Sequence, residues 1–174
     1  MIVAGDTAFT HVVSFAGAGR RFDDEMRGSF VRALRRQLEF SGLECVTFAF
    51  LADRFHLLLH LPDPSPFLAD ADDSIILERL ALVYDQRRLG VFREELDALR
   101  KARKNREADR MVKGITDRMF QLSTFMKEFK GTISREVNRR TGARGGVWEE
   151  RYRSIHVQSG DALLTTAAYI DLAG

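Results

Sequence analysis

Residues 48–62 read FAFLADRFHLLLHLP, and this stretch decides the fold. From residue 54 onward its side chains alternate, which is the two-residue period of a β-strand with two unlike faces. One face carries Phe55, Leu57, Leu59 and Leu61, and the other carries Arg54, His56, Leu58 and His60. A second strand-like run occupies residues 43–51. The two residues Ala52 and Asp53 between the runs suit a tight reversal, so the stretch predicts a hairpin.

The segments around the hairpin complete the order of an α+β domain. In sequence they are a strand at 9–15, a helix from about 23 to 40, the hairpin, a long helix at 113–140, a strand at 152–158 and a last helix at 162–172. A ferredoxin-like split βαβ unit begins with a strand, then a helix, then a hairpin, which is the order seen here. We therefore expect an α+β fold with an antiparallel sheet of four to five strands and helices on one face. In the last strand, Ile155 and Val157 are expected to point inward.

Residues 72–112 predict a helical insertion within a single domain that spans residues 1–174. One helix is expected from Ser74 to about Gly90, because apolar residues recur there at helical spacing. The following run, residues 91–110, is mostly charged and predicts a solvated helix with a narrow apolar stripe.

The strongest helix signal lies in residues 113–140. Apolar residues recur every three or four positions, at Ile115, Met119, Leu122, Met126, Phe129, Ile133 and Val137. This stripe predicts packing against a core. The opposite face carries Lys127, Lys130, Arg135, Arg139 and Arg140, which is typical either of a solvated helix or of a row facing phosphates.

Composition indicates a folded protein without a membrane segment. Of the 174 residues, 45% are hydrophobic, and no apolar run approaches the roughly 20 residues that a spanning helix needs. The first residues lack the basic-then-apolar pattern of a secretion signal, so a cytoplasmic location is expected. The single cysteine, Cys45, excludes an internal disulfide and is expected to be a small buried apolar residue.

Charge is unevenly distributed along the chain, although the net charge is only +2. Residues 113–153 hold ten Lys or Arg against five Asp or Glu, whereas residues 63–78 hold five acids and no base. A basic side of this kind favours a polyanionic partner, but a solvated helix face explains the pattern about equally well.

A histidine-bearing strand and a tyrosine on a late helix can serve phosphodiester chemistry. Histidines supply nitrogen ligands for a divalent metal that polarises the phosphodiester. A tyrosine hydroxyl can then attack phosphorus and become covalently linked to DNA. Ligands for one ion must lie close together on one strand face. His60 lies about 13 Å along the strand from His56, at ~3.3 Å per residue, which is too far to share an ion.

Four segments of the chain share their order and spacing with a known family. They are residues 11–14 (HVVS), residues 51–59 (LADRFHLLL), residues 137–154 (VNRRTGARGGVWEERYRS) and residues 168–172 (AYIDL). Together they resemble the motifs of single-tyrosine transposases of the small insertion-sequence type and of their REP-associated tyrosine transposase relatives. Residues 51–59 resemble the HUH motif of that family. The resemblance covers nearly the whole chain, and it matches residues 72–110 to a helical insertion found in one branch.

The resemblance implies a ferredoxin-like HUH domain that binds single-stranded or hairpin DNA at the ends of mobile elements. Active members cut and rejoin DNA through a 5′-phosphotyrosine with Mg²⁺ or Mn²⁺. Carried over by position, Tyr169 is the catalytic nucleophile and His56 is a metal ligand.

Three positions depart from the family pattern. Arg54 replaces the first motif histidine, and arginine cannot ligate a metal because its guanidinium stays protonated. Asp53 replaces the motif asparagine, and Ala173 replaces the polar residue that completes the metal site in active members. Only His56 remains of three expected ligands. We therefore expect a weak or inactive nuclease, with Mg²⁺ or Mn²⁺ if it is active and no metal otherwise.

The predicted function is recognition of single-stranded or hairpin DNA in transposition, with an impaired tyrosine endonuclease site. Arg54 is expected to contact a phosphate directly. The residues predicted to bind DNA are Arg54, Lys127, Lys130, Arg139, Arg140, Arg144, Trp148, Arg151 and Arg153. The resemblance allows a homodimer, but the sequence does not fix the oligomeric state.

Alternatives remain open at this point. One is an active metal-dependent nuclease in which Asp53, His56 and another carboxylate rebuild the metal site. Another is a ferredoxin-like interaction module that binds no nucleic acid. At the level of single residues, His56 and Tyr169 also fit purely structural roles, and Trp148 fits an anchor for the last strand as well as a base-stacking residue.

Overall fold

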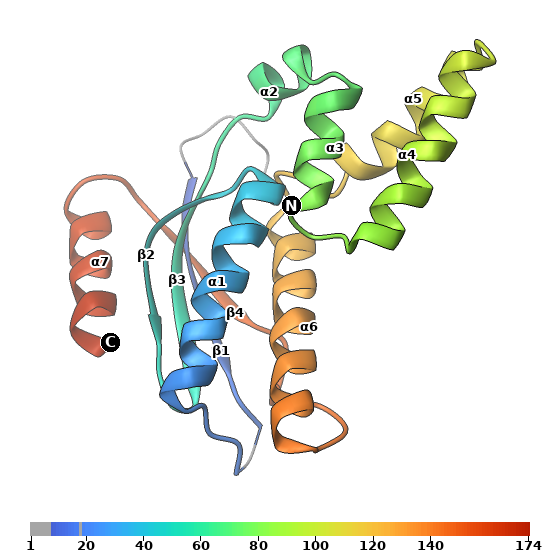
Figure 1. Cartoon of the computed structure of the whole chain (residues 1–174). Helices are drawn as coiled ribbons and strands as arrows, with labels where there is room; N and C mark the ends of the chain where they lie inside the picture. The colour runs from blue at the N-terminus through green and yellow to red at the C-terminus, as the bar shows by residue number, and fades with distance from the viewer. Residues whose placement is uncertain (1–7, 18) are drawn as a thin grey trace.

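A computed structural model describes residues 8–17 and 19–174, which form one sheet and seven helices (Figure 1). The strands are β1 (Ala8–Phe15), β2 (Glu44–Phe50), β3 (Arg54–Leu61) and β4 (Arg153–Val157). The helices are α1 (Asp24–Ser41), α2 (Ser65–Asp70), α3 (Asp73–Ala81), α4 (Gln86–Lys101), α5 (Asn105–Thr116), α6 (Leu122–Thr141) and α7 (Asp161–Ala173). Within the described residues, no helix is both long enough and apolar enough to cross a membrane.

The four strands lie in the order β2-β3-β1-β4, and each neighbouring pair is antiparallel. With α1 between β1 and β2, and α6 before β4, this is the ferredoxin-like arrangement. The predicted α+β class and antiparallel sheet are confirmed. The predicted hairpin is the pair β2-β3, in which Phe50 lies opposite Phe55 beside the turn.

Helices α1 and α6 cover one face of the sheet (Figure 1). The core on this face contains Phe55, Leu57 and Leu59 of β3, which are fully buried. Phe30 of α1 and Phe129 of α6 pack in the same cluster. The apolar side of the alternating pattern in β3 is therefore the side that faces these two helices.

Helix α7 lies on the opposite face, so the sheet is sandwiched between α7 and the pair α1 and α6 (Figure 1). Ile170 of α7 is fully buried against Leu58, Ala49 and Val157. The expectation of helices on one face therefore holds for α1 and α6 but not for α7. Val157 points inward as predicted. The same prediction for Ile155 is wrong, because that side chain is 67% exposed on the edge strand β4.

Helix α1 begins and ends where its local sequence predicts. The side chain of Asp23 accepts a hydrogen bond of 2.7 Å from the backbone N–H of Met26 and caps the helix. At the other end, Gly42 adopts a left-handed φ of +72°, and its N–H donates to the carbonyl of Leu38. The chain then enters β2 directly.

The single helix predicted over residues 113–140 is wrong, because the chain breaks at residues 117–121 between α5 and α6. Phe120 has a positive φ of +55°, which interrupts the helical path. Its N–H donates to the carbonyl of Ser41 at 2.7 Å. A tertiary hydrogen bond to the end of α1 thus fixes the point where the chain turns into α6.

Helices α2 to α5 fill residues 65–116 between β3 and α6, where the sequence predicts a helical insertion at 72–112. The single helix predicted from Ser74 to about Gly90 is wrong, because the chain turns at residues 82–85. Asp85 caps α4 by accepting a hydrogen bond from the backbone N–H of Arg88.

A separate apolar cluster holds helices α2 to α5 together. Its fully or nearly fully buried members are Phe40, Ile76, Leu80, Ile115 and Met119. Because Phe40 belongs to α1, the insertion is packed onto the end of that helix.

Candidate functional site

Three side chains from three elements meet on the α7 face of the sheet. Val13 of β1 lies opposite His56 of β3, which places His11 on the same face and one diagonal step away. Nε2 of His11 is 3.1 Å from Nδ1 of His56. The ring of Tyr169 lies steeply inclined to both imidazoles, with centroid separations of 6.3 Å to His11 and 5.9 Å to His56. The predicted nucleophile and the predicted metal ligand therefore lie side by side.

Both imidazoles are neutral near pH 7. Burial is the main cause that lowers the pKa of His56, which is only 5% exposed. Protonation of His11 and the charge of Arg54 act in the same direction, whereas Asp53 opposes them. Burial also lowers the pKa of His11. Two neutral rings share one hydrogen bond, in which one nitrogen donates and the other accepts. Tyr169, in contrast, is 57% exposed, so its hydroxyl is open to a ligand on this face.

Arg54 lies at the start of β3 and gives this face a cationic end. Its guanidinium donates two hydrogen bonds to the carboxylate of Asp53, at 3.0 and 3.2 Å, and lies over the ring of Phe15. The guanidinium of Arg153 in β4 lies over the same ring, 5.4 Å from its centroid. Two arginines from two strands therefore converge on one aromatic ring, on the sheet face that carries His56.

The ligand set implied by the resemblance does not fit the residues present. Arg54 offers no lone pair, and Ala173, in the last turn of α7, offers no ligand atom. In residues 8–17 and 19–174, no three His, Cys, Asp or Glu side chains are grouped to hold a metal ion. Burial raises the pKa of the Cys45 thiol to about 12, so it supplies no thiolate.

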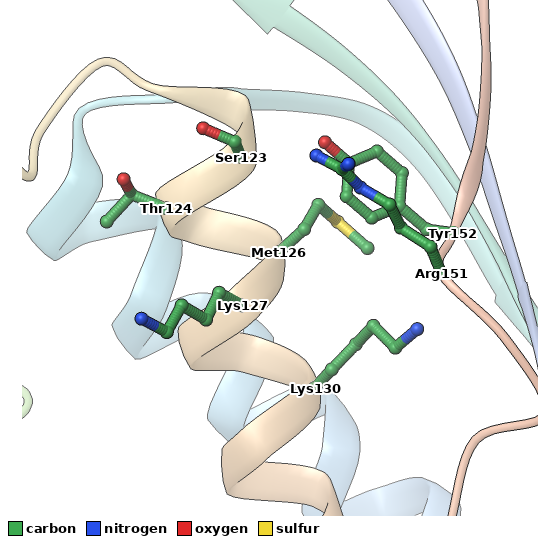
Figure 2. Close-up of a pocket in the computed structure, with 7 residues that line it drawn as sticks. All are labelled: Ser123, Thr124, Met126, Lys127, Lys130, Arg151 and Tyr152. Atoms are coloured by element: carbon green, nitrogen blue, oxygen red, sulfur yellow. The ribbon is translucent and has the colours of Figure 1, made fainter.

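A basic pocket of about 490 Å³ lies between α6 and the segment that leads into β4 (Figure 2). Its lining residues are Ser123, Thr124, Met126, Lys127, Lys130, Arg151 and Tyr152. Figure 2 shows Met126 and Lys130 pointing toward Arg151 and Tyr152, whereas Lys127 points away from them. The ammonium group of Lys130 donates to the carbonyl of Glu150 at 2.9 Å, and burial lowers its pKa. Three of the predicted DNA-binding residues thus surround one pocket that no carboxylate lines.

A second basic hollow lies between α1 and α6, on the other side of the sheet from Tyr169. Two adjoining pockets of about 660 and 430 Å³ form it and share Ala33, Arg36, Thr132 and Arg135. Neither Arg36 nor Arg135 forms an ion pair with any residue that the structure describes. Two unpaired guanidiniums, one from each helix, therefore line this hollow.

The predicted DNA-binding residues at the end of α6 are partly neutralised by acids. Arg139 and Arg140 both form ion pairs with Glu136, and Arg140 also pairs with Glu25 at 2.8 Å. Arg144 is exposed in the loop that follows. Of these three, Arg144 is the one that forms no ion pair within the described chain.

Trp148 packs against the core on the α1 and α6 side. Its indole N–H donates to the backbone carbonyl of Lys130 at 3.1 Å, and its ring packs on Phe22 and Phe55. A half-buried ring with its donor already used is poorly placed to stack on a base. This geometry favours the anchoring role that the sequence left open.

Sequence reasoning missed the position of His11 and the role of the α1 arginines. The alternation in β1 shows that His11 and Val13 share a face, but the pairing of β1 with β3 is needed to bring His11 to His56. Arg36 likewise can be assigned to the hollow only once α1 is seen to pack against α6.

Comparison with solved structures shows which proteins share this fold. The chain superposes on a REP-associated tyrosine transposase bound to a REP hairpin with a TM-score of 0.54 and 10% sequence identity, over 99% of this chain and 68% of the other. A candidate transposase from Deinococcus radiodurans R1 aligns with a TM-score of 0.47 and 15% identity, over 99% of this chain and 97% of the other. No protein-family model matches the chain, and no curated protein sequence matches it. The chain therefore has the fold of a REP-associated tyrosine transposase, the fold that its motifs predict.

Proposed function

We propose that this protein is a transposase-like DNA-binding protein that recognises single-stranded or hairpin DNA. The observation that carries the proposal is the convergence of Tyr169 and His56 with Arg54 and Arg153 on one sheet face. This convergence occurs in a fold shared with a transposase that binds a DNA hairpin. A sheet face that carries a tyrosine and two guanidiniums is suited to a phosphodiester, because guanidiniums bind phosphate oxygens through paired hydrogen bonds.

Arg54 and Arg153 are the proposed phosphate contacts nearest the tyrosine. Both lie over Phe15, and Arg153 is exposed. Asp53 already accepts two hydrogen bonds from Arg54, so a phosphate would compete with this carboxylate or use the remaining donors. Arg153 forms no ion pair with a described residue and is the stronger candidate of the two.

The pocket beside α6 is the proposed second contact with DNA. Lys127, Lys130 and Arg151 supply positive charge there, and Tyr152 supplies a partly buried aromatic ring. Phosphate contacts by such side chains dominate affinity and make it depend on salt. The arginines of the hollow between α1 and α6 lie on the other side of the sheet from Tyr169, so a DNA that contacts both Tyr169 and this hollow would have to be longer than a few nucleotides.

Strand cleavage is proposed to be weak or absent. The neutral pair of His11 and His56 can accept a proton, but the residues that the structure describes form no three-ligand metal site of the kind that the resemblance implies. Without a bound cation, charge on the phosphorane would be balanced only by the nearby guanidiniums.

A binding titration tests recognition. Labelled single-stranded and hairpin oligonucleotides are titrated with protein between low and physiological salt, and we expect affinity to fall steeply as salt rises. Arg153→Gln should weaken binding and reduce the slope of log K against log salt by about 0.7 on single-stranded DNA, the value for one lost phosphate contact. The matched control is Arg106→Gln, which removes an exposed arginine of α5 outside both proposed contacts. Failure to bind any member of the panel at low salt would favour the protein-interaction alternative.

Covalent capture tests cleavage on the same oligonucleotides, with Mn²⁺ and with EDTA. We expect no adduct, or a trace that Tyr169→Phe abolishes and Tyr84→Phe preserves. Tyr84 is a suitable control because its hydroxyl accepts a hydrogen bond from Arg118 far from this face. An efficient, metal-dependent adduct through Tyr169 would show that the protein is an active nuclease and would overturn the proposal of an impaired site.

A further inference from the structure

We propose that the hollow between α1 and α6 is a binding site for a ligand with two or more neighbouring phosphate groups, which Arg36 and Arg135 contact. Such groups occur in a free triphosphate, for example a nucleoside triphosphate, and along the backbone of a nucleic acid strand. The hollow lies on the other side of the sheet from Tyr169, so this inference does not depend on DNA recognition at the tyrosine.

Positive charge dominates the lining of the hollow. The two adjoining pockets that form it are lined by eight Lys or Arg residues and only two Glu residues. Both carboxylates are already neutralised. Glu128 forms an ion pair with Arg118, and Glu136 forms ion pairs with Arg139 and Arg140. A concave surface with this excess of one charge attracts a multivalent anion.

Arg36 and Arg135 are the central cations, because both line both pockets. Neither forms an ion pair with a residue that the structure describes. Arg135 donates one hydrogen bond of 3.0 Å to Oγ1 of Thr132, which leaves most of its five donors available. Since a guanidinium binds phosphate oxygens through paired hydrogen bonds, each arginine can hold one phosphate group.

Further cations extend the site on both sides of this central pair. Lys127 lines the larger pocket only, and Arg32 lines the smaller pocket only. Figure 2 shows Lys127 pointing away from Arg151, so its ammonium group belongs to the hollow and not to the pocket beside β4. A ligand with two or three phosphates can therefore contact cations beyond Arg36 and Arg135.

Gly131 leaves open space in the wall that α6 contributes to the hollow. A Cβ atom at this position would meet only the terminal Nη1 of Arg135, at an ordinary distance of 3.6 Å. Helix stability does not explain this glycine, because glycine is a poorer helix former than alanine. A larger side chain at position 131 would fill part of the hollow without changing its charge, which allows shape and charge to be tested separately.

Calorimetric titration with inorganic triphosphate, without DNA or divalent cations, tests the site. We expect one triphosphate per chain and an affinity that falls as salt rises. Arg36→Gln and Arg135→Gln should each weaken binding about tenfold, since each removes hydrogen bonds between charged groups. The matched control is Arg35→Gln, because Arg35 is exposed on α1 and lines neither pocket. Equal losses for Arg35→Gln and Arg36→Gln would overturn the proposal, since they would show attraction by net charge alone.

A second pair of variants tests the shape of the hollow with all its cations retained. Gly131→Leu should weaken triphosphate binding because the side chain occupies the space between the helices. Gly131→Ala adds a single methyl group and should bind nearly as well as the unsubstituted protein. Circular dichroism of both variants checks that the helix content is unchanged. A folded Gly131→Leu variant that binds triphosphate normally would place the anion elsewhere and overturn the proposal.

Two further titrations distinguish the sources of the phosphates. If the ligand is a free triphosphate, ATP should bind, and Arg36→Gln should weaken ATP binding while leaving the affinity for single-stranded DNA unchanged. If the source is a DNA backbone, Arg36→Gln should weaken both, and inorganic triphosphate should displace the DNA. Arg153→Gln, on the other face of the sheet, should not change triphosphate binding. Failure of DNA recognition beside Tyr169 would thus leave this result intact, whereas the absence of saturable triphosphate binding overturns the proposal.

Discussion

A Cβ atom on Gly42 would lie 2.5 Å from the ring of Phe120, closer than non-bonded carbon atoms approach. Gly42 ends α1 with a left-handed φ of +72°, and Phe120 closes the turn before α6 with a hydrogen bond to Ser41. The two residues therefore join the end of α1 to the point where the insertion returns to the sheet.

Gly42→Ala should destabilise the protein by about 2 kcal/mol or more, because a left-handed backbone costs an L-residue 1–2 kcal/mol before any clash with Phe120 is counted. Urea unfolding followed by circular dichroism measures the change. Gly114→Ala is the matched control, since Gly114 lies in α5 and a Cβ there meets nothing within 4 Å. That change should stabilise the helix by roughly 0.5–1 kcal/mol. Equal changes in the free energy of unfolding at the two positions would contradict the proposed packing of Gly42 against Phe120.

Trp148→Phe separates the anchoring role from base stacking. The substitution keeps an aromatic ring against Phe22 and Phe55 but removes the hydrogen bond to Lys130. We expect the free energy of unfolding to fall by about 1 kcal/mol. DNA affinity, measured well below the unfolding temperature, should stay the same. A loss of affinity without a loss of stability would show instead that the indole contacts the nucleic acid.

Stability should fall as the pH drops below about 6.5. The pKa values of His11 and His56 are lowered in the folded protein from the ordinary value of 6.5, so the unfolded chain takes up protons first as pH falls. The free energy of unfolding then rises with pH through this window and levels off above it. Urea titrations in EDTA between about pH 5 and pH 8 measure the slope, staying above the range where most carboxylates titrate. Replacing both histidines by Gln should flatten the slope.

Thr10→Val should stabilise the protein. The hydroxyl of Thr10 is buried and has no hydrogen-bond partner within the described part of the chain. Valine has nearly the same shape and leaves no buried polar atom unpaired, so we expect a gain of about 1 kcal/mol. Calorimetric melting measures it as a rise of roughly 2–4 °C. Thr132→Val is the contrasting change, because that hydroxyl donates to the carbonyl of Glu128 at 3.0 Å and its loss should bring no gain.

The sheet could be predicted from the sequence because each strand signals itself locally. The alternation in residues 54–61 identifies both faces of β3, and Asp23 and Gly42 mark the ends of α1. The break before α6 could not be predicted in the same way. Its apolar stripe continues across the break, since Ile115 packs in the insertion and Met126 packs in the sheet core. The periodicity is therefore the same on both sides, and the turn depends on a hydrogen bond to a distant residue.

The candidate site was predictable only in part. Tyr169 and His56 come from motifs that the sequence carries, and the structure places them together. The diagonal contact between His11 and His56 depends on the register of β1 against β3, which no local pattern fixes. The role of Trp148 could not be predicted from the sequence, because its position in a basic segment does not show that its ring packs against the core.

The rings of Phe67 and Phe120 lie 5.5 Å apart, so the chain leaves the sheet domain and returns to it at one place. The 52 residues between them begin and end close together in space, so a short Gly-Ser linker could replace them. Excision would uncover Phe40, the α1 residue that lies under the insertion, so a polar residue would be needed there. Such a shortened protein would retain the whole Tyr169 face, and it would show whether the insertion contributes to recognition or is an independent attachment.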